Sequence, residues 1–336
     1  MKHPTILPLS INARRRPLQR NVGALLLVAG LALGSMLVGA CGGSDDGATD
    51  AGVTSVAASF YPIAEAAGRV GGDCVEVVDL TPEGMSPHDA EPTPQSIAAL
   101  QGASVAFYLG SDFQPQVQRA VDALPDDVVA IDLLEVDSLR TIDSPIPGVV
   151  GEVDGEVLAG GRDPHMWVDP VLFSEMVRGI QDGLVAANPG CADAINANAE
   201  AYLADLAQLD EDFVSALATC ETRTLVTSHA AFGYLADRYG LKQAPIAGIS
   251  PEQEPNAQSL RAVAEVARAD GVKTVFFEEL VPPDLAEVVA SEIGAQTAAL
   301  DPVEGLPSDA VAEGESYVSI QRRNLDALRQ GLGCTA

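Results

Sequence analysis

Hydrophobic and polar positions alternate in blocks along the chain from residue 53 onward. Short apolar runs, typical of buried strands, are separated by stretches with apolar residues three and four positions apart, as in amphipathic helices. The runs lie at 53–58, 75–80, 104–109 and 128–133, and again at 224–227, 243–247, 274–277 and 296–300. The helical stretches lie at 62–70, 94–101 and 115–124, and again at 230–239, 257–269, 283–293 and 317–332. Strands separated by helices predict two Rossmann-like α/β lobes with mostly parallel sheets.

Between the two blocks lies a segment, 192–219, that contains no Gly or Pro. Its apolar residues form one helical stripe, Ile195, Ala199, Tyr202, Leu206, Leu209, Phe213 and Leu217. At 1.5 Å per residue a single helix here is roughly 40 Å long. We therefore predict a lobe at 53–190 and a lobe at 221–336, joined by one long rigid helix at 191–220.

The first forty residues have the pattern of an export signal. Five basic residues and no acidic ones precede an apolar run, and LVGAC at 37–41 resembles a bacterial lipoprotein lipobox. We expect a signal peptide at 1–40, a lipidated Cys41 and a flexible tether at 41–52. An uncleaved membrane anchor is the alternative, and the export route, general secretory or twin-arginine, stays open. The mature protein is expected to be exported and lipid-anchored to the outer face of the cytoplasmic membrane, or periplasmic.

The charge of the chain excludes one class of partner. The 19 basic and 48 acidic residues give a net charge of −29, and without the five basic residues of the leader the net charge is −34. Nucleic-acid binding needs clustered Lys and Arg, so we expect no nucleic-acid partner. Neutral or cationic partners fit this balance.

Four cysteines remain after Cys41, an even number that suggests two disulfides in an exported protein. Three pairings of Cys74, Cys191, Cys220 and Cys334 are possible. Cys191 and Cys220 flank the ends of the predicted long helix, too far apart for the roughly 7 Å Cα separation of a disulfide. We predict Cys74–Cys191 and Cys220–Cys334, one disulfide in each lobe.

The mature chain has only three histidines, and all of them precede predicted helices. His88 and His229 also follow predicted strands, where ligands bind in open α/β sheets. An isolated loop histidine is usually a solvated or capping side chain, but three at equivalent junctions suit Zn²⁺ bound in the cleft between the lobes. We predict His88, His165 and His229 as ligands. Asp301, after the last strand, is the predicted carboxylate ligand, with Glu278 and Glu279 in reserve.

At these residues the sequence resembles the cluster A-I substrate-binding lipoproteins of ABC transporters, which capture zinc or manganese outside the cell. The resemblance spans about 53–332 and rests on GMSPHDAEPTP at 84–94, DPHMWVDP at 163–170, TSHAAFGYL at 227–235, GISPE at 248–252, FEEL at 277–280 and the segment 317–324. The resemblance implies two lobes joined by one long helix, with His88, His165, His229 and Asp301 as ligands. It also implies a monomeric binding protein, not an enzyme, that delivers its ion to an ABC permease.

Several alternatives stay open. Family members with Glu at the position of His229 tend to bind manganese, whereas His there is common among zinc binders, so zinc is expected and Mn²⁺ is the alternative. Many zinc members carry a histidine-rich loop before the second ligand motif, but the loop at 141–162 contains no histidine. A zinc-dependent hydrolase and a surface adhesin, a role of some relatives, are the rival functions.

Overall fold

The computed structural model describes residues 52–135, 163–252, 254–307, 310 and 314–335. These residues all belong to one unit, Ala48–Ala336. The predicted signal peptide, Cys41, nearly all of the tether and the loop at 141–162 lie outside the described residues. Within the described part of the chain, no helix has the length and apolar character needed to cross a membrane.

The first lobe is a parallel four-stranded sheet covered by helices on both faces. Its strands are β1 (Thr54–Ala58), β2 (Val75–Asp79), β3 (Val105–Tyr108) and β4 (Val129–Asp132), in the order β2-β1-β3-β4. Val56 and Ala58 of β1 face the main hydrophobic core, whereas Ala57 faces a smaller cluster on the other side, because successive strand residues point to opposite faces. Its helices are α1 (Tyr61–Gly71), α2 (Pro94–Gly102) and α3 (Pro115–Asp122), followed by α4 (Pro170–Ala187).

The second lobe repeats this topology. Its strands are β5 (Thr224–Thr227), β6 (Lys242–Pro245), β7 (Thr274–Phe277) and β8 (Gln296–Ala299), in the order β6-β5-β7-β8, and all pairs are parallel. Its helices are α6 (Gly233–Arg238), α7 (Ala257–Ala269), α8 (Asp284–Ile293) and α10 (Tyr317–Gly331). In both sheets the strand order reverses beside the central strands, at β1/β3 and at β5/β7. Such a switch point leaves a crevice at the carboxyl ends of the strands.

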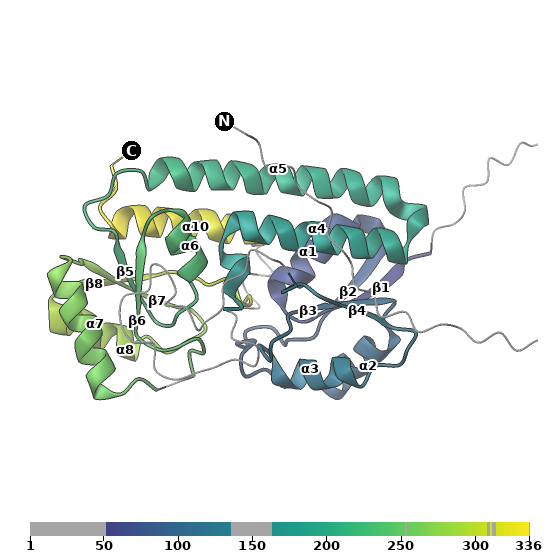
Figure 1. Cartoon of the computed structure of the whole chain (residues 1–336), viewed down its shortest axis with the longest axis horizontal. Coiled ribbons are helices and arrows are strands. Elements are labelled where there is room, and N and C mark those ends of the chain that lie inside the picture. The colour runs from purple at the N-terminus through teal and green to yellow at the C-terminus, as the bar shows by residue number, and fades with distance from the viewer. Residues whose placement is uncertain (1–51, 136–162, 253, 308–309, 311–313, 336) are drawn as a thin grey trace, which may run out of the picture. The chain divides into compact units, whose positions relative to one another are not determined.

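The predicted connecting helix is α5 (Ala192–Ala216), which begins one residue later and ends four residues earlier than the predicted 191–220. It packs against α1, α4 and α10, and Figure 1 shows it running alongside both lobes. The predicted stripe faces inward, and Ile195, Leu206 and Phe213 are fully buried. At 1.5 Å per residue its 25 residues span about 37 Å. The predicted fold class, two parallel α/β lobes with one long helix, is confirmed.

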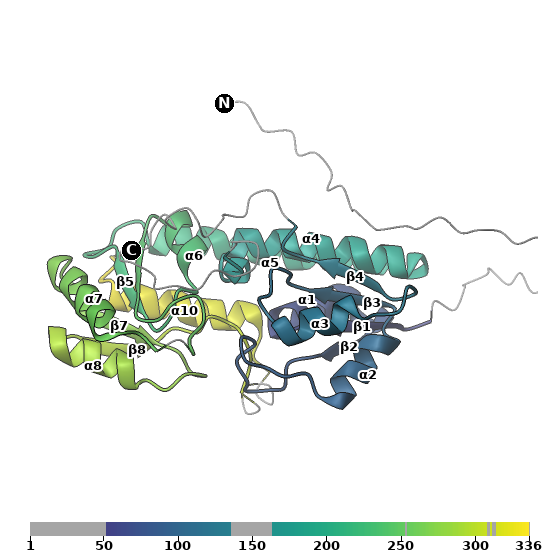
Figure 2. The same ribbon diagram turned by 60° about the horizontal axis from the view of Figure 1, so that its bottom comes forward.

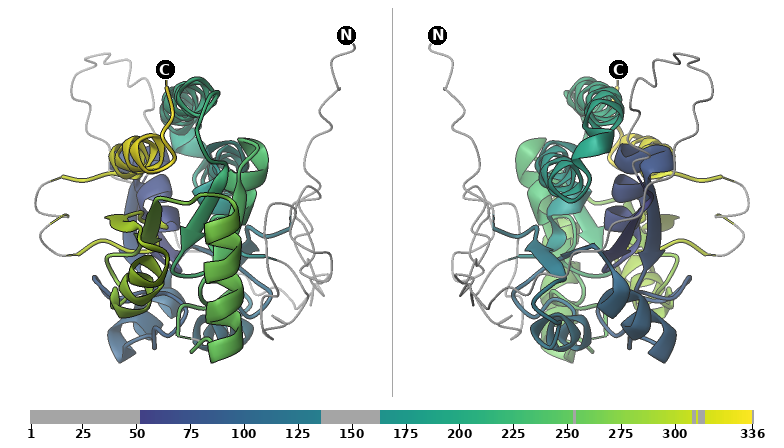
Figure 3. Two further views of the ribbon diagram at one scale, coloured as in Figure 1. Left: turned by 90° about the vertical axis from the view of Figure 1, so that its left-hand side faces the viewer. Right: turned by 90° about the vertical axis from the view of Figure 1, so that its right-hand side faces the viewer.

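One hydrophobic core continues through both lobes on the side of the sheets that faces α5. It contains residues of β1 and β3, of β5 and β7, and of α1, α4, α5, α6 and α10. The opposite faces of the sheets are filled separately, with α2 and α3 on the first and α7 and α8 on the second (Figure 2). Seen from either end, α10 and α5 lie on the same side of the strands (Figure 3). The lobes therefore share a continuous helical layer.

Both predicted disulfides are present. Cys74, at the end of the short 3-10 helix η1 (Gly72–Cys74), pairs with Cys191, at the end of η3 (Pro189–Cys191), with a Cα separation of 6.3 Å. Cys220 pairs with Cys334 and joins the entry to β5 to the chain after α10. Each disulfide thus closes a loop of more than a hundred residues at one end of the shared helical layer.

Candidate metal centre

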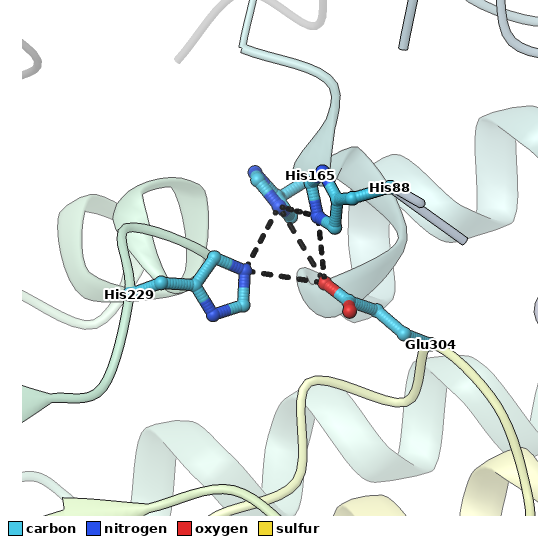
Figure 4. A group of neighbouring side chains, drawn as sticks. All are labelled: His88, His165, His229 and Glu304. Carbon is cyan, nitrogen blue, oxygen red and sulfur yellow. Dashed lines mark hydrogen bonds and ion pairs between the residues drawn. The ribbon is translucent and has the colours of Figure 1, made fainter. Parts of the chain in front are cut away.

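Four side chains from both lobes converge on one point, where three imidazole rings and a carboxylate face one another (Figure 4). They are His88, His165, His229 and Glu304, and their ligand atoms all lie within 4.8 Å of one another. Oε1 of Glu304 is 3.3 Å from Nε2 of His88, 3.6 Å from Nε2 of His165 and 3.2 Å from Nε2 of His229. Nε2 of His165 is 3.4 Å and 3.3 Å from Nε2 of the other two histidines.

These separations match the edges of a small tetrahedron. Zn–N and Zn–O distances of about 2.0–2.1 Å place tetrahedral ligand atoms about 3.3–3.4 Å apart. Five of the six separations in the group are 3.2–3.6 Å. All four side chains are at most 4% exposed. The group is therefore spaced and shielded to hold one small divalent cation.

The switch point of the second sheet positions His229. His229 follows the end of β5 by two residues, and Glu278 directly follows β7, so the two meet at the carboxyl ends of neighbouring strands. Oε1 of Glu278 accepts hydrogen bonds from the backbone N–H of His229 at 3.1 Å and from its Nδ1 at 2.7 Å. Protonation at Nδ1 leaves the Nε2 lone pair free for a metal, a common arrangement around metal-bound histidine.

The same arrangement holds His165, which begins the 3-10 helix η2 (His165–Val168). Oδ1 of Asp163 accepts from the backbone N–H of His165 at 3.0 Å and from its Nδ1 at 2.8 Å. Sequence reasoning missed this role for Asp163, although the two-residue spacing in Asp-Pro-His was visible. Glu278, predicted as a reserve ligand, instead contacts the far nitrogen of His229.

Electrostatics in the metal-free site favour charged imidazoles beside ionised carboxylates. Burial alone would lower the pKa of His229, but the charges of Glu278 and Glu304 outweigh it and raise that pKa to about 10. Burial likewise opposes the charge on His165, and hydrogen bonds to Asp163 and Glu304 raise its pKa. Burial would raise the pKa of Glu304, but the neighbouring histidines hold it well below its usual range. Without a metal, the raised pKa values of His165 and His229 therefore favour protonated imidazoles in the space between the four side chains.

The carboxylate that the structure brings to the three histidines is Glu304, whereas the predicted Asp301 lies outside the group. Oδ1 of Asp301 accepts a hydrogen bond from the backbone N–H of Val303 at 2.7 Å, and Asn324 binds the backbone of Asp301 on both sides. The Asp301 side chain thus binds the backbone of its own loop. The carboxylate that faces the histidines belongs to Glu304, three residues later. Burial raises the pKa of Asp301 to about 7.

Aromatic residues pack against the histidines of the group. Trp167 is fully buried, with ring centroids 4.7 Å from Phe60 and 5.3 Å from Phe113, and Phe113 lies edge-on to His88 at 4.9 Å. Trp167 also lies beside His165, with ring centroids 5.1 Å apart. Its Nε1 donates to the carbonyl of Pro302 at 2.8 Å, which ties the segment carrying His165 to the loop carrying Glu304.

Residues 56–331 match the family model described as "Zinc-uptake complex component A periplasmic". The chain is 35% identical over 306 residues to the high-affinity zinc uptake system protein ZnuA of Bacillus subtilis, covering 88% of this chain and 94% of that protein. It is 33% identical to the zinc-binding lipoprotein AdcA of Streptococcus pneumoniae, of whose length it spans only 56%.

Solved structures with the same fold include metal-bound and adhesin relatives. The Zn(II)-bound ZnuA-like domain of S. pneumoniae AdcA has a TM-score of 0.68 and 32% identity, covering 84% of this chain and 99% of that domain. The laminin-binding protein Lmb of Streptococcus agalactiae, described as an adhesin with metal-transporting activity, has a TM-score of 0.72 and 31% identity, with coverage of 83% and 99%. The family model covers most of the chain, and the chain is therefore a member of the family of periplasmic A components of zinc-uptake complexes.

Proposed function

We propose that this protein binds one Zn²⁺ ion outside the cytoplasm and delivers it to an ABC permease for uptake. The observation that carries the proposal is the group of three Nε2 atoms and one carboxylate oxygen at tetrahedral spacing. His88, His165, His229 and Glu304 are the proposed ligands. The names of the relatives, which describe zinc uptake and zinc binding, support the same ion.

Zinc is favoured over manganese by the donor set. Imidazole nitrogen suits zinc, whereas Mn²⁺ prefers oxygen ligands and six-fold coordination. Three of the four donors here are nitrogen, and fixed carboxylate partners on His165 and His229 limit how far the rings can turn to widen the site. A manganese-binding role is the alternative within the same family.

The same geometry argues against a zinc hydrolase. Catalytic zinc sites keep three protein ligands and leave one position for water. In the proposed site Glu304 lies within 3.6 Å of all three imidazole nitrogens and takes the fourth position. A carrier that binds and releases its ion fits four protein ligands better than an enzyme does.

Export, lipid anchoring through Cys41 and a monomeric state complete the proposal. Export and lipid anchoring rest on the basic and apolar leader, the lipobox-like LVGAC and the lipoprotein name of one relative. The monomeric state rests on the family resemblance alone. A lipid anchor would keep the protein near the membrane that holds the permease.

Metal analysis of the purified protein, followed by chelator-competition titration with Zn²⁺ and with Mn²⁺, tests the proposal. We expect one zinc per chain, tighter binding of zinc than of manganese, and loss of high-affinity binding in His165→Ala. Glu292→Gln is the control, because Glu292 is an exposed acid paired with Arg268 on the surface. Unchanged zinc affinity in His165→Ala would refute the site, and preference for Mn²⁺ would refute the choice of ion.

A further inference from the structure

Val303, the residue directly before Glu304, has a backbone conformation that valine rarely adopts. Its φ is +60°, and its side chain is fully buried in the main core. A β-branched residue at positive φ is a genuine outlier, since its Cβ substituents crowd the backbone. The other two non-glycine residues at positive φ in the described ranges are Ser111 and Asp112, and Asp tolerates this conformation much better. Such strain persists only where the surroundings enforce it, and it occurs often at ligand sites.

Three buried side chains enforce this conformation by binding the backbone of residues 301–303. Asn324 of α10 accepts from the Asp301 N–H at 2.9 Å and donates to its carbonyl at 2.6 Å. The carboxylate of Asp301 accepts from the Val303 N–H at 2.7 Å, and Trp167 donates to the Pro302 carbonyl at 2.8 Å. Asn324, Asp301 and Trp167 are at most 8% exposed. Each of the three residues before Glu304 is therefore held by at least one hydrogen bond.

We propose that Asn324, acting with Asp301, is a positioning residue that holds Val303 in its strained conformation and so aims the Glu304 carboxylate at the three histidines. The Glu304 carboxylate lies 3.2–3.6 Å from the three histidine nitrogens, and the backbone of residues 301–303 sets the point from which its side chain reaches them. Release of the Val303 φ to a negative value would swing Glu304 away. A metal site tolerates a displacement of only about 0.5 Å.

This inference deepens the proposed zinc site and rests on it, because it takes Glu304 as a ligand. A purely structural role for Asn324 is the competing explanation, since loss of a buried double hydrogen bond destabilises any protein. Substitution of Val303 separates the two explanations. Glycine adopts positive φ about as readily as negative φ, so in a Val303→Gly background the backbone needs no enforcement and Asn324 should matter little for the metal.

The test is a double-mutant cycle of Asn324→Ala and Val303→Gly, measured by zinc affinity and by the visible absorption of Co²⁺-substituted protein. In the wild-type background we expect Asn324→Ala to weaken zinc binding about 10–100-fold, as loss of outer hydrogen-bond partners does at metal sites. The Co²⁺ bands should lose intensity as tetrahedral coordination is lost. In the Val303→Gly background the same substitution should change zinc affinity by less than about threefold, because glycine adopts positive φ without help from Asn324. Both variants compared there lack the valine side chain, so the cavity that it leaves cancels from the comparison.

Asn188→Ala is the matched control, because Asn188 is also a buried asparagine that fixes a backbone, donating to the carbonyl of Gly52 and to Oγ1 of Thr54 far from the ligands. It should lower stability and leave zinc affinity and the Co²⁺ spectrum unchanged. If Asn324→Ala does not fold, Asn324→Asp replaces it, since it keeps the acceptor and loses the donor. Equal losses of affinity in both backgrounds, or none in either, would overturn this inference alone. Absence of zinc binding by the wild-type chain would overturn the proposed function as well.

Discussion

Zinc binding by this protein should release protons at neutral pH. A metal-bound imidazole is neutral at Nε2, but in the metal-free site His229 has a pKa of about 10, because Glu278 and Glu304 outweigh the effect of burial. The pKa of His165 is raised in the same direction by Asp163 and Glu304. Glu304 is held ionised by a lowered pKa and has no proton to release. Zinc must therefore displace at least the proton of His229 at any pH below about 10.

The size of the pH dependence of zinc affinity follows from competition between protons and zinc for the histidine nitrogens. Each proton displaced makes the apparent affinity rise about tenfold for each pH unit, as long as the pH stays below the pKa of the group. Between pH 6.5 and 8.5 the displacement of one proton predicts an increase of about a hundredfold, and a proton on His165, whose pKa is also raised, adds to it. The sign is fixed, since raised pKa values mean that acid favours the metal-free state.

Isothermal titration calorimetry of Zn²⁺ binding in two buffers of different ionisation enthalpy measures the number of protons released. At pH 7.5 we expect at least about one per ion. Glu278→Gln keeps the acceptor for the Nδ1 proton but removes the charge that raises the His229 pKa, so it should release fewer protons at this pH. The reasoning is refuted if zinc binding releases no protons at pH 7.5 and its affinity is flat from pH 6.5 to 8.5.

Three further predictions concern single features. Glu304→Gln should weaken zinc binding at least about a hundredfold in chelator competition. Asp301→Asn keeps the acceptor for the Val303 N–H, so it should change zinc affinity by less than about threefold. A larger loss in Asp301→Asn than in Glu304→Gln would restore Asp301 as the ligand. Burial raises the pKa of Asp79 to about 7, so its ionisation opposes folding increasingly as pH rises from about 4 to 7. Asp79→Asn should then stabilise the protein by about 1–4 kcal/mol at pH 8 and by less at pH 5, and an equal gain at both pH values in urea unfolding would contradict this. Replacing Cys74 and Cys191 by Ser should cost about 2–5 kcal/mol of unfolding free energy while zinc affinity stays within about threefold; an unchanged urea midpoint would show that the disulfide is dispensable.

Most of the fold could be predicted from the sequence because each element has a strong local pattern. The β-branched runs and the stripe on α5 lie where their periods predict, since the same burial that makes the pattern also fixes the element. The boundaries differ where tertiary contacts compete. Helix α6 begins at Gly233 instead of residue 230, because the chain before it is bound elsewhere, His229 to Glu278 and Ala230 to the carbonyl of Gly248.

The three histidines could be predicted because they are scarce and follow a general rule, that ligands lie just beyond the carboxyl ends of parallel strands. The same rule chose Asp301 as the carboxylate, since it is the first acid after β8. The rule fails there because hydrogen bonds from other elements fix the backbone of the loop directly after β8. Asn324 and Trp167, which lie on separate elements, form hydrogen bonds with the backbone of residues 301 and 302. The positive φ of Val303 then turns Glu304 toward the histidines. Valine is among the residues least expected at positive φ, so no local pattern could indicate this turn. The identity of the proposed fourth ligand depends on contacts between segments far apart in the sequence, and only the folded chain contains them.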